Sequence, residues 1–220
     1  MMDRDNPALN RLEKQLNPQH SAVAVIDLQN DFVSAKGLLA REKGLDVEPI
    51  RPVINAANSL VSLARKSGVR VFWIRVVHTI ADSPKNYLEK YLGHLPEDQW
   101  TDDKLLAREG SWGAEWDEEI LPRLDSEPEI LKRNYSGFYG THFDHMLRAQ
   151  GVRTLLFAGC NTNVCVQATA SDAFYRGYYS IMVEDACASV TPEMNANFIE
   201  NHKKWFGDTT DIAALRAYWG

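Results

Sequence analysis

Short apolar runs recur along this chain and are separated by stretches with helical periodicity. SAVAVID (21–27) and VRVFWIRVV (69–77) are rich in β-branched residues, and RTLLFAG (153–159) and YYSIMVED (178–185) continue the pattern. Runs of this length that are apolar at almost every position are typical of strands buried on both faces of a parallel sheet. EILK (129–132) predicts a shorter strand of the same kind.

The stretches between these runs predict helices. Apolar residues follow one helical stripe over 50–64, and Gly68 ends that helix. Further helices are predicted over 141–151, 163–177 and 193–206. Parallel strands joined by helices need right-handed crossovers, which leave helices on both faces of the sheet. The predicted fold class is therefore α/β, a three-layer α/β/α sandwich with a mainly parallel, Rossmann-like sheet.

Length and charge narrow the possible functions. The 220 residues favour one domain, expected over 21–220 behind a polar N-terminal tail, 1–20. The net charge of -6 and the lack of a basic run argue against nucleic acid as a partner. No stretch approaches the roughly 20 apolar residues that span a bilayer, so no membrane partner is expected.

The cysteines favour a reducing compartment. Cys160, Cys165 and Cys187 make an odd count, and no secretory signal is visible in the first twenty residues. Free thiols and a cytoplasmic location are therefore expected.

One segment, 79–113, breaks the strand–helix rhythm. It is polar but carries large aromatic residues, among them Tyr87, Tyr91, Trp100 and Trp112. A connection this long is often a functional lid, a binding loop or an interface segment. A surface excursion with a short helix over 86–92 is the alternative.

Three reactive side chains follow predicted strands. Asp27 comes directly after AVAVI, Lys132 after EIL, and Cys165 opens the helix that follows LLFAG. Because ligands bind outside the carboxyl ends of parallel strands, an acid, an amine and a thiol are expected to meet at one edge. Taken singly, each has a plainer explanation: a turn residue, a solvated lysine and a small core hydrophobe.

The meeting of these groups predicts nucleophilic chemistry. A helix N-terminus and a neighbouring ammonium both lower the pKa of a thiol, so Cys165 is expected to form a thiolate. Asp27 could take the thiol proton and later deliver it to a leaving amine.

Four segments resemble the isochorismatase-like cysteine hydrolase superfamily. They are VIDLQNDF (25–32), LKRNYSGFYGTHFD (131–144), GCNTNVCVQATASDAFYRGY (159–178) and VEDACAS (183–189), which occur in the order of that family. Within it, KGLLAREKGLDVEPIRPVI (36–54) is similar to the branch of ureidoacrylate and N-carbamoylsarcosine amidohydrolases.

The resemblance implies a catalytic triad of Asp27, Lys132 and Cys165. It also implies a cis peptide bond between Cys160 and Asn161, with the backbone N–H groups of Asn161 and Cys165 as the oxyanion hole. The implied activity is cysteine-dependent hydrolysis of a C–N bond in a small ureide or amide, through a thioester-type intermediate and without a cofactor. Members of the family are commonly dimers or tetramers, so a homo-oligomer is expected.

Substrate-binding residues are expected around the same edge. Arg75 would suit a substrate carboxylate through a forked pair of hydrogen bonds, with a salt bridge to a neighbouring acid as the alternative. The other expected pocket residues are Asn30, Phe32, His78, Trp112 and Tyr135. The nicotinamidase branch holds a metal through an Asp-x-His at the end of the second strand. Here that place reads Arg75-Val76-Val77-His78, so no metal is expected.

Other functions stay open at this point. An isochorismatase-type enzyme can lack the cysteine, which this chain keeps, and a nicotinamidase-type enzyme would need the metal ligands. A non-catalytic binding module would be free to lose the cysteine. A thiol sensor using Cys160 and Cys165 would place them as C-x₄-C, which differs from the C-x-x-C of redox motifs.

Overall fold

The computed structural model describes residue 12 and residues 14–220. Its centre is a six-stranded sheet in the order β3-β2-β1-β4-β5-β6, in which every neighbouring pair is parallel. The strands are β1 (Ser21–Ile26), β2 (Arg70–Val76), β3 (Glu129–Lys132), β4 (Thr154–Cys160), β5 (Tyr179–Ala188) and β6 (Asp208–Thr210). The chain adds β2 and β3 on one side of β1 and β4, β5 and β6 on the other. Ligands in such sheets bind where the direction changes, at the carboxyl ends of β1 and β4.

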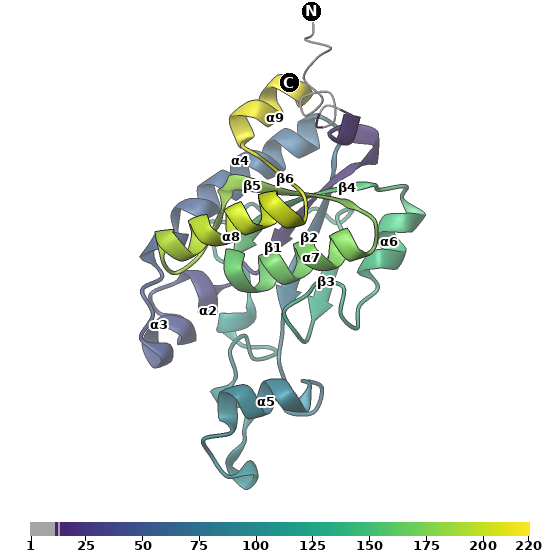
Figure 1. Ribbon diagram of the computed structural model, residues 1–220. Coiled ribbons are helices and arrows are strands. Elements are labelled where there is room, and N and C mark those ends of the chain that lie inside the picture. Colours follow the sequence, from purple (N-terminus) through teal and green to yellow (C-terminus); the bar gives the residue numbers. More distant parts are fainter. Residues whose placement is uncertain (1–11, 13) are drawn as a thin grey trace, which may run out of the picture.

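Helices cover both faces of the sheet (Figure 1). One face carries α4 (Pro52–Lys66) and α9 (Ile212–Trp219), whose apolar side chains share a core cluster with Val23 and Val25 of β1. The other carries α6 (Phe143–Ala149), α7 (Gln167–Tyr175) and α8 (Pro192–Trp205), packed against Ala22, Ala24 and Ile26. Alternate residues of one buried strand thus serve two cores, and the predicted three-layer α/β architecture is confirmed.

Three shorter helices are α2 (Asn30–Val33), α3 (Leu38–Lys43) and α5 (Lys85–Leu92). Figure 1 shows α5 on an arm that projects away from the sheet. The remaining turns are η1 (Pro18–His20), η2 (Glu48–Ile50), η3 (Glu97–Gln99), η4 (Asp102–Lys104) and η5 (Trp112–Ala114), all 3₁₀, and η6 (Thr162–Val166), a π-helical turn. Within the described part of the chain, no helix is long and apolar enough to cross a bilayer.

Several elements differ from the sequence prediction. The helix expected over 163–177 is divided into η6 and α7, and β5 runs three residues beyond its predicted end. Neither β6 nor α9 was predicted; β6 has only three residues, which carry no usable periodicity. The described end of the predicted polar tail is packed rather than free: Leu16 is buried, and its carbonyl accepts the indole N–H of Trp219. Residues 1–11 and 13 of that tail lie outside the described residues.

Backbone geometry at the ends of β1 and β4 prepares the functional edge. Asp27 has a φ of 52°, a left-handed conformation that asparagine and aspartate adopt more readily than most residues. Gly159 has a φ of 126°, and a Cβ there would lie 2.0 Å from the carbonyl oxygen of Ile26. Only glycine therefore allows β4 to approach β1 this closely, directly before the segment that carries Cys165.

Candidate active site

Asp27, Lys132 and Cys165 meet at the carboxyl edge of the sheet and are called the Asp27–Lys132–Cys165 cluster below. The ammonium of Lys132 lies 2.8 Å from Asp27 Oδ2 and 3.4 Å from Cys165 Sγ. Its third contact is the backbone carbonyl of Asn134, at 3.1 Å. All three ammonium protons therefore have an acceptor, and the side chains of Lys132 and Asp27 are 0% and 1% exposed.

The carboxylate of Asp27 is fixed from several sides. Its Oδ1 accepts the backbone N–H of Val76, at the end of β2, at 3.0 Å. The backbone carbonyl of Asp27 accepts the thiol of Cys160 at 3.1 Å. Because β1, β2 and β4 all hold this residue, its position is set by the sheet itself and not by a loop.

The thiol of Cys165 is held in its protonated form. Burial raises its pKa, and the negative charge of Asp27 raises it further, by charge and by hydrogen bonding. Lys132 acts in the opposite direction without overcoming these effects. Burial therefore acts against the thiolate that the sequence predicted, because it removes the water that would stabilise the anion.

The ammonium of Lys132 stays charged. Burial lowers its pKa, but the charges of Asp27 and Cys165 outweigh burial, so the net shift is upward. The cluster therefore holds an ammonium, a carboxylate partner and a protonated thiol, in which the proton of Cys165 faces a base.

A cavity of about 430 Å³ opens over the cluster. Asp27 and Cys165 lie in its wall together with Phe32, His78 and Tyr135, as the sequence predicted for those three side chains. The remaining lining residues are Leu39, Lys43, Leu45, Val76, Tyr87, Tyr91, Leu106, Cys160, Asn161, Asn163, Val164, Val190 and Met194. A mainly apolar wall with a few polar groups is typical of a small-molecule site.

His78 takes part in this wall as a neutral side chain. Its Nδ1 lies 3.1 Å from Ser83 Oγ, and its ring stacks on Tyr87 with centroids 4.2 Å apart. Burial, followed by the charges of Lys132 and Arg133, lowers its pKa to about 3. It therefore contributes a polar edge and no positive charge at neutral pH.

Comparison with known proteins agrees with this geometry. The isochorismatase domain family matches residues 21–214, almost the whole described chain. The chain belongs to the isochorismatase family. It is thus an isochorismatase-family hydrolase, and the cysteine-bearing edge lies where strands β1, β3 and β4 end.

Relatives within the isochorismatase family are similar over most of their length. A ureidoacrylate amidohydrolase RutB from Acinetobacter baylyi is 35% identical over 209 residues, covering 91% of this chain and 84% of the relative. The solved N-carbamoylsarcosine amidase from Thermoplasma acidophilum is 29% identical, with a TM-score of 0.68, covering 87% of this chain and 95% of that one. A cysteine hydrolase from Pseudomonas syringae shares the fold, with a TM-score of 0.78 at 24% identity and coverage of 93% and 94%.

The peptide bond between Cys160 and Asn161 is cis, as the resemblance to the family implied. Cys165 follows in η6 rather than in the first turn of a regular α-helix, which begins at Gln167. Asn161 and Cys165 both line the cavity.

Arg75 does not lie in the cavity of this isochorismatase-family site. Its guanidinium contacts Glu129 at 3.3 Å and Glu115 at 3.3 Å and donates to the carbonyl of Ala114 at 3.0 Å. Successive residues of a strand face opposite sides, so the neighbouring Val76 lines the cavity while Arg75 points away from it. The salt-bridge alternative therefore describes this residue, and the expected substrate contact is not found.

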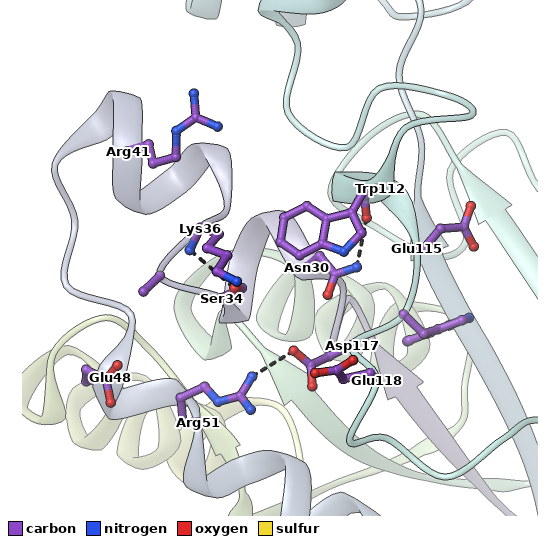
Figure 2. Close-up of a pocket in the computed structure, with 12 residues that line it drawn as sticks. Asn30, Ser34, Lys36, Arg41, Glu48, Arg51, Trp112, Glu115, Asp117 and Glu118 are labelled. Atoms are coloured by element: carbon purple, nitrogen blue, oxygen red, sulfur yellow. Dashed lines mark hydrogen bonds and ion pairs between the residues drawn. The ribbon is translucent and has the colours of Figure 1, made fainter.

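Asn30 and Trp112 also lie outside the cavity. Figure 2 shows them together in a separate, open depression, where Asn30 Nδ2 donates to the carbonyl of Trp112 at 2.8 Å. Trp112 is 53% exposed there. This depression contains neither Asp27 nor Cys165 among its lining residues, so the two side chains are not placed to touch a substrate at the cysteine.

No group of three or more His, Cys, Asp or Glu side chains able to hold a metal ion occurs among the described residues. All three cysteines are free. The thiol of Cys187 donates to the carbonyl of Phe157, as that of Cys160 does to Asp27, and burial raises the pKa of both thiols. Cys160 and Cys187 are thus both buried and bonded to backbone carbonyls, and Cys160 also borders the cavity.

The sequence did not single out Lys43, Tyr87 and Tyr91 as wall residues. Lys43 ends α3, and both tyrosines come from α5, so the segment 79–113 supplies part of the cavity wall. The available signal was the aromatic pair at i and i+4 in a polar segment, which places both rings on one helix face.

Proposed function

We propose that this protein is a cysteine-dependent amidohydrolase that cleaves a C–N bond of a small ureide or amide. The observation that carries the proposal is the buried contact of Lys132 with both Asp27 and Cys165 in the floor of a small-molecule cavity. The relatives named ureidoacrylate amidohydrolase and N-carbamoylsarcosine amidase support the choice of bond.

In the proposed first step, Asp27 removes the proton of Cys165 as the sulfur attacks the carbonyl carbon. Since the resting thiol is protonated, proton removal and attack belong to one event that begins when substrate is bound. Lys132 stays positively charged. It compensates the negative charge while that charge moves from the carboxylate of Asp27 to the sulfur of Cys165. The tetrahedral oxyanion accepts hydrogen bonds from the backbone N–H groups of Asn161 and Cys165, and losing one such donor typically costs about 10²–10³ in rate.

The second half of the reaction returns the enzyme to its starting state. Asp27 gives its proton to the leaving nitrogen, the C–N bond breaks, and a thioester or thiocarbamate remains on Cys165. Asp27 then takes a proton from water, whose oxygen attacks the acyl carbon, and the released sulfur recovers that proton. No cofactor enters the sequence, and activity is expected to survive chelation of metals.

The proposal extends to the setting of the enzyme. The free and buried cysteines suit a reducing compartment, so we place the protein in the cytoplasm. We also propose that the protein forms a homo-oligomer. The small-molecule substrate is the only partner that the site requires.

Replacing the nucleophile tests the proposal directly. With a panel of ureides, N-carbamoyl amino acids and simple amides, ammonia release by Cys165→Ala should fall by at least about 10³-fold. Cys187→Ala is the matched control, because it also removes a buried thiol but lies away from the cavity. Turnover by Cys165→Ala near the wild-type rate would disprove cysteine catalysis. Equal reactivity of Cys160 and Cys165 with iodoacetamide, unaffected by any amide, would favour a thiol sensor instead.

A further inference from the structure

Among the charged side chains that line the cavity, one is not compensated by a neighbouring charge. Of the residues that line it, only Asp27, His78 and Lys43 can carry a charge near neutral pH. Asp27 is neutralised by its contact with Lys132 below, and His78 is uncharged because burial lowers its pKa to about 3. The ammonium of Lys43 is therefore the charge that remains for a ligand in this cavity.

Lys43 lines the cavity and is exposed to solvent. It is the last residue of α3 and is exposed, whereas the cluster at the floor is buried. Its Nζ lies 5.9 Å from the ring centroid of Tyr91, the one side-chain interaction that Lys43 makes with the described part of the chain. No carboxylate of the described chain lies within ion-pair distance of Lys43, in contrast to Arg75, which is paired.

The tyrosine whose ring Lys43 approaches also belongs to a pair of hydroxyl groups. Tyr91 Oη and Tyr135 Oη are 2.8 Å apart, and both residues line the cavity. Two hydroxyl groups bring two protons, and their mutual hydrogen bond uses one of them. No further acceptor for the second proton is found among the described residues. Burial and the bond to Tyr135 raise the pKa of Tyr91, so the pair keeps both protons.

We propose that Lys43 and the Tyr91–Tyr135 hydroxyl pair form a carboxylate subsite, and that the substrates are amides or ureides bearing an acidic group at the end remote from the scissile carbonyl. This inference rests on the proposed function, since it names the substrate class of the same site. An ammonium and a hydroxyl donor together satisfy a carboxylate, while the carbonyl lies at Cys165. Leu39, Leu106 and Val190 also line the cavity, and their apolar side chains suit a short carbon chain.

The test compares two substrates of matched length, N-carbamoyl-β-alanine and the uncharged N-carbamoylpropylamine. In the Lys43→Met variant, which keeps the length of the side chain, the ratio of kcat/KM for acid over neutral substrate should fall about tenfold. Lys43→Glu should lower the ratio further. Arg41→Met is the control: it removes a cation from the same helix, but one that lines the separate depression, and should leave the ratio unchanged.

A second measurement does not depend on turnover. In the Cys165→Ala background, calorimetry should show that Lys43→Met weakens binding of N-carbamoyl-β-alanine about tenfold relative to N-carbamoylpropylamine. Added salt should weaken the acid selectively, because the subsite is exposed. An unchanged ratio in both assays, or a wild-type preference for the neutral compound, would overturn the subsite. Cys165-dependent ammonia release would then still support the proposed function. If no substrate were turned over but calorimetry showed the selective loss of affinity for the acid, the result would support the subsite alone.

Discussion

Lys132 is a fully buried cation whose charge is compensated at short range. It lies 2.8 Å from Asp27 Oδ2, and both side chains are almost completely removed from solvent. Removing one partner of such a pair leaves an unpaired buried charge, which typically costs about 3–5 kcal/mol. We therefore expect Lys132→Met to lower the free energy of unfolding by about that amount, measured by urea denaturation, and to abolish ammonia release.

The double variant Asp27→Asn/Lys132→Met separates stability from catalysis. With both charges gone, the folded state should recover all but about 1–2 kcal/mol of its stability, while activity stays lost. Wild-type stability of Lys132→Met alone would show that the pair is not charged in the folded protein.

The sequence predicted that Asp27, Lys132 and Cys165 would lie together, because the ends of parallel strands define one edge. Asp27 directly follows β1, Lys132 is the last residue of β3, and Cys165 follows β4, so their adjacency in space follows from the topology of the sheet. Arg75 shows the limit of that argument: a strand end gives the edge but not the face, and its side chain lies on the opposite face from Val76. The protonation of Cys165 was also out of reach, because it depends on how completely the site is buried.

At the scale of elements, Asp31 of α2 joins two parts of the cavity wall. Its Oδ1 accepts the N–H of Leu38 at 2.9 Å, at the start of α3, and its Oδ2 accepts that of Ala107 at 2.8 Å. A neighbour of each of these two residues lines the cavity: Leu39, which follows Leu38 in α3, and Leu106, which precedes Ala107 in the segment 79–113. One carboxylate therefore sets the separation of two walls.

Asp31→Ala tests this connection. Loss of two charge-assisted hydrogen bonds should destabilise the protein by about 2–4 kcal/mol and loosen both wall segments. We expect KM to rise about tenfold, with a smaller change in kcat, because the Asp27–Lys132–Cys165 cluster is held by the sheet. Hydrogen exchange at Leu38 and Ala107 should accelerate.

Asp46→Ala provides the comparison for this variant, since Asp46 accepts a single backbone N–H, that of Glu48, in an exposed turn. It should leave KM and exchange at both wall segments unchanged. A wild-type KM for Asp31→Ala would show that the walls hold their separation without the carboxylate.

The long elements were readable from sequence, and the wall elements were not. The longer strands are recognisable in the sequence as apolar runs, and α4 as a stripe of apolar residues with helical periodicity. α2 and α3 span only four and six residues, which is too few for a periodic signal, and the wall role of α5 depends on where the arm folds back. Lys43 was missed for that reason, although it lies in the segment 36–54 that carries part of the family resemblance.

At the scale of the whole molecule, exposed aromatic residues gather away from the cavity. Phe174 and Tyr175, at the end of α7, are 45% and 69% exposed, and both contact the ring of Phe206 beyond α8. Tyr179 and Trp205 are 52% and 63% exposed. In the segment 79–113, Tyr87 is buried and Tyr91 and Trp100 pack against the same core cluster, which leaves Trp112 exposed by itself.

A contiguous aromatic surface of this kind is typical of association, and we expect it to be covered in a homo-oligomer. Light scattering at micromolar concentration should give a multiple of the 24.9 kDa chain mass. Tyr175→Arg should shift the protein toward the monomer, and Tyr139→Arg, at a residue 58% exposed outside this surface, should not. A clean monomer mass for the wild type would contradict the expectation.

The protonated state of Cys165 also bears on how long the protein lasts under oxidative stress. Peroxide attacks thiolates, and a cysteine that rests as a thiolate moves readily toward sulfenic and then irreversible sulfinic acid. Burial and the charge of Asp27 raise the pKa of Cys165, which favours the thiol form in the absence of substrate. Under the proposed function, Cys165 would lose its proton only when substrate is bound, and slow oxidation by peroxide between turnovers is the expected consequence.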